Sequence, residues 1–146
     1  MFAVPVPSSE SAVKSDIRIP SLQTAKSLPA SFYFAWQGVK YAFLTQRNFR
    51  IDIAIAALAI FLSCYLHISA PELVMVCLMI ALVLALELLN TALEAVVDLT
   101  IGKTYHELAK IAKDCAAGGV LVSAVTALVV AGILFVPRLL VLWSQP

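Results

Sequence analysis

Three long apolar segments constrain the fold of this chain more than any other feature of its sequence. Residues 51–69 are mostly apolar, residues 73–86 contain no polar side chain, and residues 116–136 are nearly all Ala, Val, Leu and Gly. A helix needs about 20 residues to cross the hydrocarbon core of a bilayer. The third segment reaches that length outright, and the first two reach it with polar residues near one end. We therefore predict an all-α membrane protein with three transmembrane helices, at about residues 51–69, 72–100 and 114–136.

The composition excludes several other classes of protein. Of the 146 residues, 62% are hydrophobic and 13% are charged, against about 45–50% and about a quarter in soluble domains. An ordinary soluble domain and a disordered chain are therefore excluded. A net charge of +1 also excludes a basic module that binds nucleic acid. The three cysteines stand singly with no CxxC pair, so neither a zinc site nor a disulfide framework is predicted.

The segment before the first span divides into two parts. Residues 1–30 are rich in Ser and Pro and lack the apolar stretch of a secretory signal, so we predict a disordered cytoplasmic tail. Residues 31–49 carry aromatic and apolar side chains at helical spacing, with Lys and Arg nearby. This pattern predicts an amphipathic helix in the plane of the lipid headgroups, and a simple lead-in to the first span is the alternative.

The positions of Lys and Arg predict the orientation in the membrane. Six basic residues precede or begin the first span, namely Lys14, Arg18, Lys26, Lys40, Arg47 and Arg50. The turn at residues 67–72 has none, and the second connection carries Lys103, Lys110 and Lys113. The positive-inside rule then predicts that the N terminus and the second connection lie in the cytoplasm. We expect a multi-pass protein of the inner (plasma) membrane.

One stripe of polar side chains interrupts the second apolar helix. Glu87, Asn90, Glu94 and Asp98 are three, four and four residues apart, so all four project from one helix face. A carboxylate at the bilayer centre costs roughly 2.5–3.5 kcal/mol even on the lenient insertion scale, so these side chains need partners. A magnesium ion is one partner, because it prefers carboxylates and phosphates. A carboxylate acting as general base on a lipid hydroxyl is another, and a polar seam between helices is the structural alternative.

A second polar cluster follows Gly102. Residues 105–114 alternate charges at helical spacing, and Lys113 can neutralise phosphate while His106 or Asp114 binds nucleotide or orients Lys113. The alternative is an ordinary charged helix beside the membrane. Gly102-Lys103-Thr104 is not a P-loop, because Val97 occupies the position of the first glycine of that motif.

These two blocks resemble the prokaryotic diacylglycerol kinase family, which includes the undecaprenol kinases. The resemblance runs from about Ser31 to Val136. Residues 87–98 are similar to the family's signature almost residue for residue, and residues 112–118 resemble its second block. Trp36 and Gly38, and then Asn48-Phe49-Arg50, resemble its interfacial helix and the entry to its first span.

The resemblance implies a homotrimeric kinase, with sites shared between subunits, that transfers the γ-phosphoryl group of MgATP to a lipid hydroxyl. By position, Glu87 would be the general base and Glu94 would hold Mg²⁺. The implied nucleotide site comprises Gln46, Asn90, Glu94, Asp98, Tyr105, His106, Lys113 and Asp114. The implied lipid site comprises Trp36, Asn48, Phe49, Arg50, Asp52 and Glu87. Positioning and charge neutralisation supply most of the catalysis in phosphoryl transfer.

Two departures from the family pattern leave alternatives open. The family usually has Glu at position 46 as a second magnesium ligand, and Gln46 offers an oxygen without the charge. Ile111 replaces an Arg found in some diacylglycerol kinases. We expect a diacylglycerol kinase that produces phosphatidic acid. Undecaprenol kinase is the first alternative, and a non-catalytic trimeric membrane protein of the same fold is the second.

Overall fold

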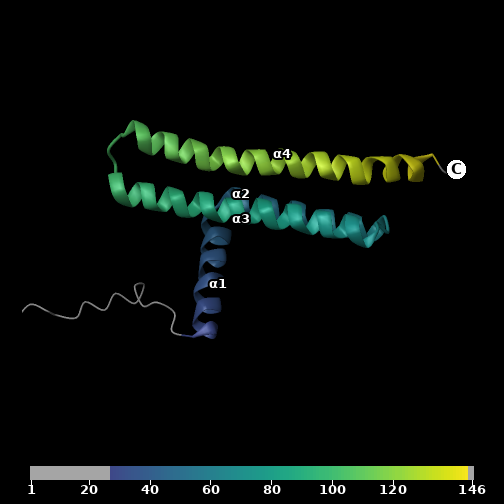
Figure 1. The fold of residues 1–146 in the computed structure, drawn as a ribbon, viewed down its shortest axis with the longest axis horizontal. Helices are drawn as coiled ribbons and strands as arrows, with labels where there is room; N and C mark the ends of the chain where they lie inside the picture. The colour runs from purple at the N-terminus through teal and green to yellow at the C-terminus, as the bar shows by residue number, and fades with distance from the viewer. Residues whose placement is uncertain (1–26, 145–146) are drawn as a thin grey trace, which may run out of the picture. The chain divides into compact units, whose positions relative to one another are not determined.

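The structure is a computed structural model that describes residues 27–144, and every regular element in that range is a helix. Figure 1 shows α1 (Leu28–Thr45), α2 (Arg47–Tyr65), α3 (Ala70–Ile101) and α4 (Glu107–Trp143). The last three are long and apolar enough to cross a membrane, which confirms the predicted all-α membrane fold. The chain divides into two units after Ala35, and the arrangement described below is that of residues 36–144.

The helix boundaries differ from those predicted from hydropathy. The predicted helix over residues 31–49 begins at Leu28 and ends at Thr45, because Gln46 has an extended backbone (φ −97°, ψ 118°) and begins the next helix. Asn48, Phe49 and Arg50 therefore belong to α2. Residues 1–26 of the predicted tail lie outside the described residues, whereas residues 28–30 are helical. Hydropathy indicates which residues suit lipid, but a helix continues into its polar flanks as long as its backbone is hydrogen-bonded.

The second span has clear start and stop signals. Ser69 and Glu72 form a capping box at the start of α3, with Pro71 in its first turn. The helix ends before Gly102, whose φ of +59° lies in the left-handed region that favours glycine. The predicted stop at Gly102 is confirmed. At 32 residues, α3 is about 48 Å long and exceeds the hydrocarbon core of about 30 Å.

The prediction that Pro137 closes the third span is wrong, because α4 continues through Pro137 to Trp143. Proline lacks an N–H and pushes away the carbonyls of the preceding turn. In the same stretch, Arg138 donates from Nη1 to the carbonyl oxygen of Leu134, in the turn before the proline, at 2.7 Å. Its Nη2 pairs with both carboxylate oxygens of Glu72 at 2.8 Å. A side chain from the neighbouring turn and an acid on α3 thus support the helix beyond the proline.

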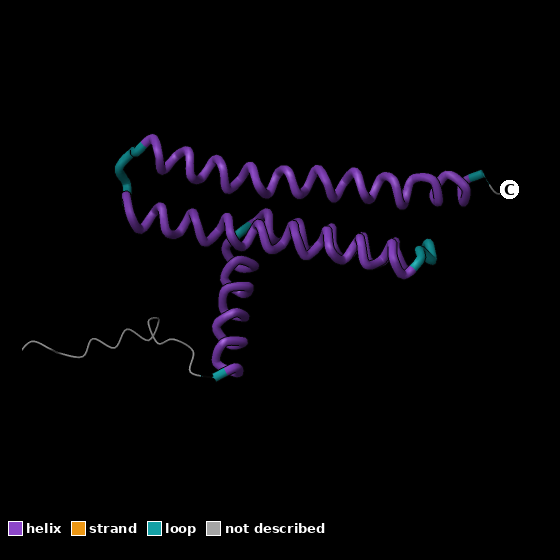
Figure 2. Tube along the Cα trace, in the orientation of Figure 1, coloured by secondary structure: helices purple, strands orange, loops and turns teal. Residues whose placement is uncertain are grey.

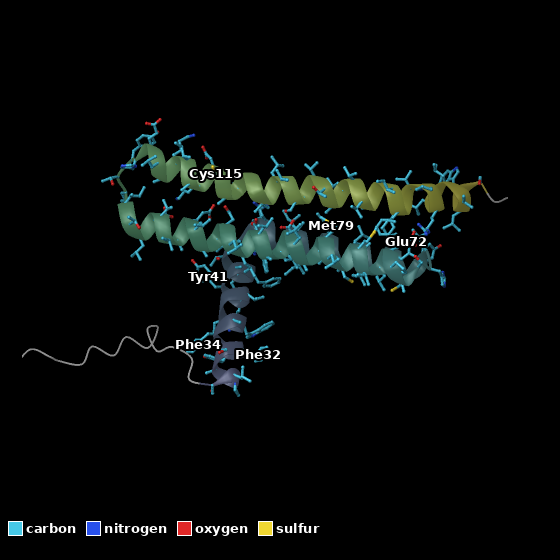
Figure 3. All side chains as sticks on the ribbon, viewed as in Figure 1. Phe32, Phe34, Tyr41, Glu72, Met79 and Cys115 are labelled. Atoms are coloured by element: carbon cyan, nitrogen blue, oxygen red, sulfur yellow. The ribbon has the colours of Figure 1, made fainter. Side chains whose placement is uncertain are left out.

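The three long helices pack side by side. Figure 2 shows α3 and α4 running alongside each other, with α2 packed mainly against α3. Buried Val76, Leu134 and Phe135 form an apolar core near the end of the bundle where α3 begins, which we call the Ser69 end. Figure 3 marks Met79 and Glu72 on this part of α3 and Cys115 toward the other end of α4. Most of the remaining apolar side chains face outward, as lipid-exposed helices require.

Candidate functional site

The predicted polar stripe forms one face of α3 at the end opposite to the Ser69 end, which we call the Gly102 end. Glu87 is its deepest member and is only 3% exposed. Thr91, one turn further along, is also buried and donates from its hydroxyl to the backbone carbonyl of Glu87 at 2.9 Å. Glu94 is half-buried and Asp98 is exposed, so the stripe runs from the protein interior to its surface. Over 11 residues this is about 16 Å along the helix axis.

Two further carboxylates exert a like-charge effect on Glu87. They belong to Asp52, from α2, and to Glu94, about two turns further along α3. Among residues 27–144, no Lys or Arg forms an ion pair with any of these three acids. Like charges near a buried acid are unfavourable unless protons, water or a bound cation compensate them.

Asn90 leaves a buried acceptor without a partner. Its side-chain N–H donates to the Oε1 of Glu94 at 3.3 Å. Its side-chain oxygen is buried and accepts no hydrogen bond in the described structure. A buried polar atom without a partner costs free energy. The amide oxygen of Asn90 and the carboxylate of Glu94 therefore form a pair of oxygen ligands available to a bound group.

An ion pair connects α3 to α4 at the outer end of the stripe. The Nζ of Lys113 lies 2.5 Å from the Oδ1 of Asp98. Beside this pair, a groove of about 250 Å³ opens between the end of α3 and the beginning of α4. Its polar lining comprises Thr104, Tyr105, His106, Lys110, Lys113 and Asp114. Two lysines in a small polar groove suit a ligand that carries negative charge.

His106 and Asp114 are both engaged within α4. The ring Nδ1 of His106 accepts from the backbone N–H of Leu108 at 3.2 Å, so His106 caps the helix. The carboxylate of Asp114 pairs with Lys110 at 2.6 Å. The structure thus places Tyr105, His106, Lys113 and Asp114 in one groove, and Lys113 pairs with Asp98.

The residues predicted from the entry to the first span are less closely connected to this site. Trp36, Asn48 and Arg50 are exposed, and Gln46 is half-buried between two helices. Phe49 is only 2% exposed, so its ring packs inside the protein. Asp52 lines an apolar cavity of about 170 Å³ between α2, α3 and α4. No hydrogen bond within the described chain links Gln46 to the stripe.

Sequence comparisons identify the family. Residues 33–135 match the family described as prokaryotic diacylglycerol kinase. A diacylglycerol kinase of Synechocystis sp. is 52% identical over 135 residues, which cover 92% of this chain and 77% of that protein. An undecaprenol kinase of Bacillus subtilis is 39% identical, over 75% of this chain and 88% of that protein. The diacylglycerol kinase of Escherichia coli K12 is 35% identical, over 66% and 78%. This chain belongs to the prokaryotic diacylglycerol kinase family.

The described residues of this lipid kinase fit a magnesium ion only in part. No three His, Cys, Asp or Glu side chains between residues 27 and 144 cluster as a preformed metal site. Magnesium does not need one, since one or two carboxylates with substrate phosphates and water commonly hold it. Glu94 supplies a carboxylate, and the unpartnered oxygen of Asn90 supplies a second oxygen ligand.

Two residues beside the predicted site residues were not among those predicted from the sequence. Thr91 is buried beside Glu87, and Lys110 lines the groove together with Lys113. The signal for Lys110 was present in the sequence, because it lies three residues before Lys113 and four before Asp114. Helical spacing alone did not indicate that the end of α3 lies next to the face of α4 that carries Lys110.

Proposed function

We propose that this protein transfers the γ-phosphoryl group of ATP to the hydroxyl of diacylglycerol, giving phosphatidic acid and ADP. One observation supports this proposal above all. The buried acid Glu87 lies on the same face of α3 as Asp98, and the ion pair of Asp98 joins that face to Lys113 of α4. Lys113 also lines the polar groove at the Gly102 end. The hydroxyl of a membrane lipid near Glu87 and the phosphates of a water-soluble nucleotide near Lys113 can therefore approach each other along this face of α3.

Each site residue has a proposed role in the reaction. Glu87 accepts the proton of the lipid hydroxyl, whose oxygen forms a bond to the γ-phosphorus while the bond from that phosphorus to ADP breaks. Lys113 neutralises phosphate charge as the phosphoryl group moves. Tyr105, His106 and Asp114 line the nucleotide groove, and Asp98 orients Lys113. Trp36, Asn48, Phe49, Arg50 and Asp52 remain the proposed lipid-contacting residues.

Magnesium is the proposed cofactor, held by Glu94 and Asn90, with Gln46 as a weaker third ligand. When bound, the ion neutralises phosphate charge and orients the nucleotide. The chain's own contribution on α3 is to supply two oxygen ligands on one helix face, four residues apart.

We also propose the assembly and the orientation. The outward-facing apolar residues of α2, α3 and α4 are available to a second and third copy, so a homotrimer with shared sites is the expected form. The Gly102 end carries Lys103, Lys110 and Lys113 and faces the cytoplasm, where ATP is available. The membrane is the plasma (inner) membrane.

Two lipid acceptors fit the family. The relative that is 52% identical is named a diacylglycerol kinase, which favours diacylglycerol. The relative that is 39% identical is named an undecaprenol kinase, so this activity is the second candidate. Both acceptors present a primary hydroxyl at the membrane surface, and the proposed chemistry is the same for each.

A lipid-competition assay tests the proposal. Purified protein receives labelled ATP, Mg²⁺ and equal amounts of diacylglycerol and undecaprenol in mixed micelles. We expect labelled phosphatidic acid to predominate. We expect Glu87→Gln to lower kcat by about 100-fold or more, which is the contribution of a general base. Glu107→Gln, which neutralises an acid of α4 outside the groove lining, is the matched control.

The outcomes separate the hypotheses. Predominant labelling of undecaprenol would support the second candidate instead. Glu87→Gln with the rate of the parent would refute the assigned base. A folded parent that binds no MgATP would support the non-catalytic alternative.

A further inference from the structure

We propose that Lys110 is a second nucleotide-contacting residue, which binds the phosphates that remain on ADP, while Lys113 acts on the transferred phosphoryl group. This inference rests on the proposed kinase function and assigns different phosphates of ATP to the two lysines. Lys110 has no assigned role in the family resemblance described above.

The two lysines line the same groove from one face of α4. They are three residues apart, which places them on neighbouring turns with about 4.5 Å between them along the axis. Both line the groove of about 250 Å³ together with Tyr105 and His106. A polyphosphate chain in this groove can therefore contact both ammonium groups at once.

The order of the phosphates follows from the direction of the two helices. Lys113 pairs with Asp98 at the outer end of the stripe, and Glu87 lies deeper along α3. Because α4 begins at the Gly102 end, Lys110 lies one turn further from Glu87 than Lys113 does. The γ-phosphate must reach the base, so the preceding phosphates extend toward Lys110.

Helix energetics give no reason for a lysine at position 110. It lies in the first turns of α4, where the helix dipole disfavours a cation. Its i,i+4 pair with Asp114 has the basic residue first, which is the less favourable order. Lys113 adds a like charge three residues away. A bound polyanion removes all three disadvantages.

The Lys110–Asp114 pair is also easy to exchange. The two side chains are 61% and 62% exposed, and exposed pairs contribute little to stability. A phosphate oxygen can therefore replace Asp114 at the Nζ of Lys110 at small cost. Asp114 acts as a temporary counter-ion that holds the lysine in the groove.

Steady-state kinetics of Lys110→Met in mixed micelles test this inference, with Lys103→Met as the matched control. Lys103 is also a basic residue of the Gly102 end, but it is not part of the groove lining. We expect Lys110→Met to raise the KM for MgATP and the inhibition constant for ADP about tenfold, the loss of one charge-assisted hydrogen bond, with little change in kcat. Lys110→Arg keeps the charge and should retain most of the affinity. Lys113→Met should lower kcat instead.

Each result bears on a different claim. Equal kinetic constants for Lys110→Met and Lys103→Met, with an active parent, would overturn the inference and leave the proposed function intact. A loss in kcat alone would overturn the assignment of Lys110 to the ADP phosphates. An inactive parent that binds no MgATP would overturn the proposed function, and this inference with it. Size-exclusion elution identical to that of the parent checks that each variant is folded.

Discussion

Gln46 lies where two helices meet and keeps its side chain free for a ligand. It caps α2 with an extended backbone, and its side chain makes no capping hydrogen bond. An amide oxygen at this position is a neutral metal ligand, whereas the family usually offers a carboxylate. Under the proposed function, the residue therefore bears on metal affinity more than on folding.

Gln46→Glu should strengthen magnesium binding. We expect the free Mg²⁺ concentration for half-maximal activity to fall by roughly tenfold, because affinity rises with the number of charged ligands. The helix tolerates the change, since an acid at an N-cap interacts favourably with the helix dipole. Initial rates over a magnesium titration measure this.

Gln37→Glu is the control for that titration, because it adds the same charge at an exposed position of α1. Identical magnesium curves for the parent and Gln46→Glu would contradict a metal-binding role of position 46. An inactive parent that gains activity through Gln46→Glu would support the non-catalytic alternative.

At the scale of elements, the Ser69 end shows how α4 continues beyond Pro137. Glu72 serves two purposes there, since it completes the capping box of α3 and pairs with Arg138 of α4. Arg138 in turn satisfies the Leu134 carbonyl. These contacts lie about 33 Å from Glu94 along α3, so they stabilise the bundle without contacting the site.

Arg138→Met should therefore lower the thermal stability but leave the kinetics unchanged. It removes the hydrogen bond to Leu134 and the ion pair to Glu72 together, so its Tm should fall further than that of Glu72→Gln. Thermal unfolding in detergent micelles measures both, and the double variant measures their coupling. A fall in kcat/KM at a temperature where the variant is folded would contradict the separation of this end from the site.

At the scale of the whole molecule, the distribution of basic residues predicts the topology. The connection between α3 and α4 carries Lys103, and the turn between α2 and α3 has no Lys or Arg. The Gly102 end should face the cytoplasm and the Ser69 end should face the opposite side. This orientation places the nucleotide groove on the side of the ATP supply.

Cysteine labelling tests this topology in intact cells. In a background with Cys64, Cys77 and Cys115 replaced by Ala, a membrane-impermeant maleimide should label Ala70→Cys directly. It should label Lys103→Cys only after the cells are permeabilised. Both positions are exposed, so accessibility within the protein does not limit the reaction. Labelling of Lys103→Cys alone in intact cells would reverse the proposed orientation.

The sequence alone determined the features that depend on local geometry. The spacing of Glu87, Asn90, Glu94 and Asp98 places them on one face of any α-helix, and the absence of polar residues from 73 to 86 requires lipid around that helix. Gly102 also marked the end of the span, because few other residues adopt its backbone conformation. These conclusions depend only on the number of residues per helical turn and on the apolar character of the lipid around the helix.

Only the tertiary structure decided which turns of α3 and α4 meet. It paired Lys113 with Asp98, brought Lys110 into the same groove, and supported the helix after Pro137 with an acid 66 residues earlier in the chain. The register between two helices depends on how all their contacting side chains pack, and no short stretch of sequence contains that information. The period of one helix says which face a residue occupies, whereas packing decides what that face contacts.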